Sequence, residues 1–157
     1  FSKYFSMTGW RLGWMIMPSD LIRPLECLSQ NLFISPSALS QVGGISAFDC
    51  YEELNQKVGL YSKNRDLLIS KLPKAGFSNL VRSDGAFYIY ANVENLAHDS
   101  VDLCQRLLVE TGVAITPGTD FDPIRGHKFV RFSFAGQSLD IEEATDRLIK
   151  WYCDHSQ

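Results

Sequence analysis

The chain has 157 residues, of which 45% are hydrophobic and 21% are charged, a composition typical of a folded domain rather than a disordered chain. Its formal net charge of −3 argues against a nucleic-acid partner, because a nucleic-acid surface needs a clustered basic excess. The apolar run LGWMIM is too short to cross a bilayer, so we expect no membrane partner either.

The first third of the sequence predicts two short strands followed by two helices. FSKYF and LGWMIM are rich in aromatic and apolar residues and predict strands joined by a turn at Thr8 and Gly9. Pro18 precedes a helix with leucines on one face, and SPSALSQVGGISAF predicts a second helix. Because glycine is unfavourable inside a helix, the Gly43–Gly44 pair indicates close packing against another element or a subunit.

The rest of the chain predicts a small sheet with helices on one side. A long amphipathic helix is expected over residues 51–72, ended by Pro73 and Gly76. Two further helices are expected over residues 99–110 and 138–152. The predicted strands are FSNLV, AFYIYANV, GVAITPG and KFVRFSFA. The fold class is therefore α/β overall, with an α+β arrangement in this second part.

The cysteines and histidines are widely spaced and match no zinc-binding motif. They are Cys27, Cys50, Cys104 and Cys153, with His98, His127 and His155. A zinc site needs ligands that can close a tetrahedron, so we expect no metal. We interpret the thiols as the idle thiols of a cytoplasmic protein.

Lys3 and Arg11 form the first candidate site. A tight turn between them can bring an amine and a guanidinium to the same edge of a sheet. An amine beside a cation is shifted toward its neutral, nucleophilic form, which Schiff-base chemistry requires. A guanidinium offers a fork that fits a phosphate. The pair therefore suits a phosphorylated aldehyde.

Arg131 is the second candidate, in the strand KFVRFSFA. Alternation places Val130, Phe132 and Phe134 on the core face and Arg131 on the other. An arginine in so apolar a strand is costly to bury unless it is paired. It either forms a salt bridge within the domain, lies on an exposed edge strand, or faces a cleft and binds a substrate carboxylate through two hydrogen bonds.

Five segments, in order, resemble the class I/II aminotransferases, the fold-type-I enzymes that use pyridoxal 5'-phosphate. SKYFSMTGWRLGW resembles their cofactor-lysine segment and LYSKNRDLLISKL their long interdomain helix. DGAFYIY resembles their Gly-Ala-Phe strand and VAITPGTDF their PG-x-x-F turn. FVRFSFAGQSLDIEEATDRL resembles their closing strand and helix. The resemblance covers essentially the whole chain.

The resemblance implies an activity and residue roles. Lys3 would form the internal aldimine with pyridoxal 5'-phosphate and shuttle the substrate proton. Arg11 would bind the cofactor phosphate, and Arg131 the substrate α-carboxylate. The substrates would be an amino acid and a 2-oxo acid, and the full-length enzyme would be a homodimer.

The resemblance also implies that the chain is the C-terminal portion of a longer enzyme. Residues 1–50 would then be a remnant of the large cofactor-binding domain, and residues 51–157 the C-terminal small domain. The acidic partner of the pyridine nitrogen and the tyrosine for the ring hydroxyl would come earlier in the chain. We therefore expect residues 51–157 to fold alone, and the chain by itself to retain no cofactor and to be inactive.

Two departures from the family and three alternatives stay open. Asp122 stands where many relatives have glycine, and Ser83-Asp84 precedes Gly85 where proline is common, which leaves the substrate undetermined. The chain could instead be the aminotransferase-like ligand-sensing domain of a transcription regulator. It could also belong to a lyase or synthase on the same scaffold, or be a relic that keeps only the fold.

Overall fold

The computed structural model describes residues 1–155. The chain divides into two compact units, Phe1–Val58 and Gly59–Gln157, called here the first and second units. The division falls inside the long helix α3 (Tyr51–Lys71), whereas the sequence predicted a boundary at the start of this helix. Within residues 1–155, no helix combines the length and the apolar character needed to cross a bilayer.

The first unit is helical. It contains the 3-10 helix η1 (Thr8–Trp10), the helices α1 (Ser19–Leu32) and α2 (Ala38–Ala47), and the first turns of α3. The fixed φ of Pro18 suits its place just before α1, and Ser37 occupies the equivalent position before α2. The two helices predicted in this part are confirmed.

The two strands predicted from FSKYF and LGWMIM are wrong. No strand occurs among the described residues of the first unit, because neither segment finds a neighbour with which to form a hydrogen-bonded ladder. The aromatic side chains of the first segment instead join a ring cluster with Phe48 and Tyr51. In this cluster the ring centroids of Phe1 and Phe5 lie 4.9 Å apart, and those of Phe5 and Phe48 lie 5.3 Å apart.

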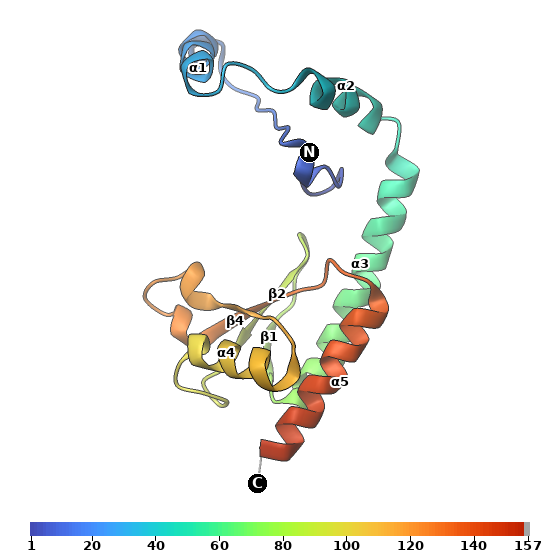
Figure 1. Cartoon of the computed structure of the whole chain (residues 1–157), viewed down its shortest axis with the longest axis vertical. Coiled ribbons are helices and arrows are strands. Elements are labelled where there is room, and N and C mark those ends of the chain that lie inside the picture. The colour runs from blue at the N-terminus through green and yellow to red at the C-terminus, as the bar shows by residue number, and fades with distance from the viewer. Residues whose placement is uncertain (156–157) are drawn as a thin grey trace. The chain divides into compact units, whose positions relative to one another are not determined.

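The second unit contains an antiparallel sheet with strand order β1-β2-β4-β3, as Figure 1 shows in part. The strands are β1 (Asn79–Val81), β2 (Tyr88–Asn92), β3 (Thr116–Pro117) and β4 (Phe129–Ser133). The helices are α4 (Ser100–Thr111) and α5 (Ser138–His155), and short 3-10 helices cover Leu72–Ala75, Gly118–Asp120 and Gly126–Lys128. The predicted strands and helices of this part are confirmed, although all four strands are shorter than predicted.

One face of this sheet carries the core. Val130 and Phe132 of β4 are buried, as the alternation predicted, and they pack with residues of α3, α4 and α5 that include Leu68, Leu107 and Leu148. Figure 1 shows α5 running beside the second half of α3. The ammonium of Lys71 in α3 joins the two helices through Asp146, at 2.7 Å, and Glu142, at 3.3 Å, both in α5.

The opposite face of the sheet is only half-buried, and it presents Arg131 with Tyr88 and Tyr90. Tyr90 lies directly across from Arg131 in the register of β2 and β4. Because the backbone of β4 is fixed by the core on its other face, the position of Arg131 follows from the packing of the second unit.

Candidate functional site

Lys3 lies in a hydrogen-bonded loop at the start of the first unit. Its side chain is exposed, and its carbonyl accepts a hydrogen bond from the amide of Ser6 at 3.0 Å. The hydroxyl of Thr8 donates to the carbonyl of Ser2 at 2.7 Å, and the amide of Met7 donates to the carbonyl of Phe1 at 3.3 Å. The residues around Lys3 are therefore folded back on one another.

Arg11 belongs to the same loop. Its guanidinium donates to the carbonyl of Thr8 at 3.0 Å, and its backbone adopts a left-handed conformation with φ of 51°. Thr8 thus bonds both to the residue that precedes Lys3 and to Arg11. The sequence predicted that the two cations meet at a sheet edge. The described residues form no sheet here, and Thr8 instead bonds Arg11 to the loop at Ser2, the neighbour of Lys3.

The turn that follows Lys3 is held against α2. The hydroxyl of Ser40 donates to the carbonyl of Trp10 at 2.7 Å. A Cβ atom at Gly43 would lie 2.9 Å from the indole ring of Trp10, and one at Gly44 would lie 2.5 Å from Leu12. The close packing predicted from the glycine pair is confirmed, and Trp10 contributes packing to this turn.

Arg131 projects from the middle of the sheet. Strand β4 lies between β2 and β3, so the alternative of an exposed edge strand is wrong. The Arg131 side chain makes no ion pair and no hydrogen bond with any residue in the described range 1–155, so the alternative of an internal salt bridge is also wrong there. Its Cζ atom instead lies 4.0 Å from the ring centroid of Tyr88 and 4.1 Å from that of Phe121.

Asp122, the first departure from the family pattern, organises the turn that carries Phe121. Its carboxylate accepts hydrogen bonds from the amides of Arg125, at 3.0 Å, and Ile124, at 2.9 Å, and also contacts the guanidinium of Arg125 at 3.3 Å. These bonds, with the backbone amide of Arg125 first, lower the pKa of Asp122 below its usual range. The stabilisation is therefore present above the usual aspartate pKa and is lost as the pH falls through the lowered value.

Ser83, in the second departure, lies in a loop held by α3. The guanidinium of Arg65 donates to the carbonyl of Ser83 at 3.3 Å, and the hydroxyl of Ser83 donates to the carbonyl of Gly85. The serine is thus engaged in local bonds that a proline could not reproduce in full.

Sequence reasoning missed Asn64, Tyr88 and Phe121. Asn64 is buried in α3, where its amide donates to the carbonyls of Phe134, at 3.2 Å, and Gly136, at 3.0 Å, just beyond β4. A lone asparagine in a helix gives no sequence signal for this role. Tyr88 could have been found, because alternation along AFYIYANV places it on the face of the sheet opposite the buried Ile89.

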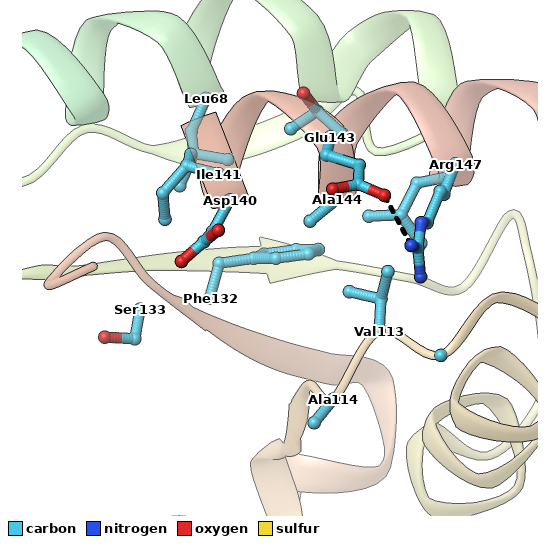
Figure 2. Close-up of a pocket in the computed structure, with 13 residues that line it drawn as sticks. Leu68, Val113, Ala114, Phe132, Ser133, Asp140, Ile141, Glu143, Ala144 and Arg147 are labelled. Carbon is cyan, nitrogen blue, oxygen red and sulfur yellow. Dashed lines mark hydrogen bonds and ion pairs between the residues drawn. The ribbon is translucent and has the colours of Figure 1, made fainter. Parts of the chain in front are cut away.

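A cavity of about 360 Å³ lies elsewhere in the second unit, between α5, β4 and residues 112–114. Figure 2 shows Phe132, Val113 and Ile141 around it, with Glu143 bonded to Arg147 at its rim. Arg147 also donates to the carbonyl of Thr111 at 3.1 Å. Arg131 does not line this cavity, and both charges of the Glu143–Arg147 pair are already engaged, so the cavity is separate from the candidate site.

Comparison with known families decides the identity of the chain. The family model described as aminotransferase class I and II matches residues 1–148. The chain belongs to this aminotransferase family. The resemblance inferred from the five sequence segments is therefore confirmed.

Individual relatives of the chain agree with the family match. The chain is 49% identical over 153 residues to a valine–pyruvate aminotransferase of Mycobacterium tuberculosis, covering 96% of this chain and 39% of the relative. It is 35% identical to an aspartate aminotransferase of Sulfurisphaera tokodaii, covering 94% of this chain and 38% of the relative. The chain thus spans about two-fifths of the length of these relatives.

Solved structures show that the fold is shared as well. A putative aminotransferase from Silicibacter pomeroyi superposes with a TM-score of 0.93 at 48% identity, covering 98% of this chain and 41% of that one. An aspartate aminotransferase of Thermus thermophilus superposes with a TM-score of 0.84 at 31% identity, covering 94% and 40%. The fold is that of the fold-type-I aminotransferases.

Proposed function

We propose that this aminotransferase-family chain takes part in moving an amino group between an amino acid and a 2-oxo acid, with pyridoxal 5'-phosphate as the cofactor. The observation that carries the proposal is Arg131, a half-buried guanidinium with no anionic partner among residues 1–155. A buried cation without a partner is costly. An incoming carboxylate would relieve that cost through two parallel hydrogen bonds.

Lys3 and Arg11 are the residues that would hold the cofactor. The exposed primary amine of Lys3 would hold the cofactor through its aldehyde carbon, in a bond that forms with loss of water, and once displaced from that carbon it would take or return a proton at its nitrogen. The exposed guanidinium of Arg11 has one hydrogen bond to Thr8, and its remaining N–H groups suit a phosphate. When bound, pyridoxal 5'-phosphate supplies the electron sink that the reaction needs.

We propose that the other contacts to cofactor and substrate come from a preceding part of a longer enzyme. The coverage of about two-fifths of the relatives supports this. On the family resemblance alone, we propose a cytoplasmic homodimer. Because the M. tuberculosis relative is named for valine and pyruvate, these are the first substrates to assay, with aspartate second.

The experiment uses the enzyme formed by this chain and its preceding part. After reduction with borohydride, peptide mapping should place the covalent cofactor adduct on Lys3. Arg131→Lys keeps the charge but loses the planar fork, so kcat/KM should fall by roughly tenfold to a few hundredfold with cofactor occupancy unchanged. Arg23→Lys is the matched control, because Arg23 forms only a highly exposed ion pair with Glu26.

Two outcomes would contradict these assignments. An adduct on another lysine, such as Lys57, would remove Lys3 from the proposal. If Arg131→Lys emptied the cofactor site and left amino-acid affinity intact, the roles given to Arg11 and Arg131 would be exchanged.

A further inference from the structure

The Arg131 guanidinium is held by two aromatic rings from separate segments. Tyr88 belongs to β2 and Phe121 follows the short helix Gly118–Asp120. Their ring centroids lie 4.0 and 4.1 Å from Cζ of Arg131, well inside the distance at which a cation is attracted to a ring face. Among the described residues, the rings of Tyr88 and Phe121 make no contact with each other. Two rings whose centroids both lie about 4 Å from Cζ on the same side would contact each other. They therefore lie on different sides of the guanidinium.

This arrangement leaves the donors of Arg131 available. A guanidinium carries five N–H groups, and no described residue accepts a hydrogen bond from this one. Its Nε atom is buried without a partner, which is normally unfavourable. The rings thus hold the guanidinium without accepting a hydrogen bond from it, and its N–H groups are not consumed by the described part of the protein.

We propose that Tyr88 and Phe121 form an aromatic clamp whose function is to position Arg131 for a substrate carboxylate. This inference rests on the proposed role of Arg131. Because the rings hold the guanidinium without using its N–H groups, those groups stay available for two parallel hydrogen bonds to a carboxylate. The clamp also orders a long side chain before the ligand arrives, so that binding does not bear that ordering cost.

Each ring is itself held in place. Tyr88 pairs with Ser133 in the β2–β4 ladder, and its ring centroid lies 4.5 Å from that of Phe87. The amide of Phe121 donates to the carbonyl of Gly118 at 2.9 Å, in a turn that the carboxylate of Asp122 closes from the other side. Asp122 therefore supports the clamp indirectly, because its carboxylate fixes the turn that carries Phe121.

The first test observes the clamp without any activity assay. In the 15N-labelled 157-residue chain, the Nε–H signal of Arg131 should be shifted by the ring currents and exchange slowly with water. Phe121→Leu and Tyr88→Leu should each move this signal toward its ordinary position and speed its exchange. Tyr88→Phe, which keeps the ring, should preserve both properties, and Arg131→Lys identifies the signal by removing it.

The second test measures carboxylate binding by titrating pyruvate against the same signal. Phe121→Leu should weaken binding by about 2- to 10-fold, the factor expected when one long side chain must be ordered on binding. Unchanged amide signals of Ile89 and Val130 show that each variant is folded. A Phe121→Leu variant that is not folded is replaced by Phe121→Met.

The outcomes separate the clamp from the role of Arg131. Ring variants that leave the Arg131 signal unmoved, or that bind pyruvate as tightly as the wild type, would overturn the clamp while the role of Arg131 stands. A wild-type signal that responds to pyruvate neither in this chain nor in the enzyme formed with its preceding part would overturn the carboxylate role, and the clamp proposal with it.

Discussion

The two units of the chain differ in how much of their own structure they stabilise. In the second unit, side chains such as Ile89, Leu107 and Val130 are fully buried in one continuous core. In the first unit the buried apolar side chains are few, and large ones such as Ile16, Ile34 and Leu39 are 87%, 82% and 71% exposed. Apolar burial is the main favourable contribution to folding, so the second unit should be the stable part of the chain.

This difference bears directly on the candidate site. Arg131 lies on a strand whose other face is the core, so folding of the second unit alone places it. Lys3 and Arg11 lie in a loop held by a few hydrogen bonds and by the packing of Trp10 and Leu12 against α2. The part of the proposed site that contains Arg131 is therefore formed by folding of the second unit, whereas the part that contains Lys3 and Arg11 is held by few interactions within the first unit.

The largest expected effect compares one substitution in each unit. Leu107→Ala removes a fully buried side chain from the core and should lower the free energy of unfolding by about 2 to 5 kcal/mol. Leu39→Ala, at an exposed position of α2, should change it by no more than about 0.5 kcal/mol. Urea unfolding followed by far-UV circular dichroism measures both, and comparable losses would show that the first unit shares the stability of the second.

A second comparison uses two asparagines of the same helix, α3. Asn64→Ala deletes the amide that bonds the carbonyls of Phe134 and Gly136, so unfolding should become easier by about 1 to 3 kcal/mol. Asn55 is exposed and accepts one hydrogen bond from Tyr4, so Asn55→Ala should be nearly neutral. If the two variants unfolded at the same urea concentration, the polar anchor assigned to Asn64 would be wrong.

The smallest expected effect concerns the helix N-termini. Asp99 caps α4 by accepting bonds from the amides of Val101, at 2.7 Å, and Asp102, at 3.1 Å, so Asp99→Ala should cost about 1 kcal/mol. Ser37 occupies the same position before α2 without a side-chain bond, so Ser37→Ala should have almost no effect. Thermal unfolding of the two variants checks this, and a larger shift for Ser37→Ala would reverse the comparison.

Much of the second unit was predictable from the sequence because its local signals agree with its packing. The alternation in KFVRFSFA, the Asp99 cap and Gly112 at the end of α4 all describe interactions made within the unit. The strands predicted from FSKYF and LGWMIM failed because a strand is completed by a neighbour, and the described chain provides none there. Aromatic composition alone could not distinguish a strand from a ring cluster.

The candidate site was predictable in part for the same reason. Arg131 stood out because a charge in an apolar strand is unusual, but its partners come from segments 43 and 10 residues away in the chain. Tyr88 could have been inferred from alternation, whereas the contact of Phe121 depends on a turn that brings it back over β4. The resemblance of VAITPGTDF to the PG-x-x-F turn indicated a bend but not its direction.

Amide hydrogen exchange of the 157-residue chain tests the central claim most directly. If the second unit holds its half of the site by itself, the amides of Ile89, Leu107 and Val130 should be strongly protected, and those of residues 3–11 should exchange almost as fast as in an unfolded peptide. Protection of residues 3–11 equal to that of the β2 and β4 amides would contradict the account, because both halves of the site would then be formed in this chain.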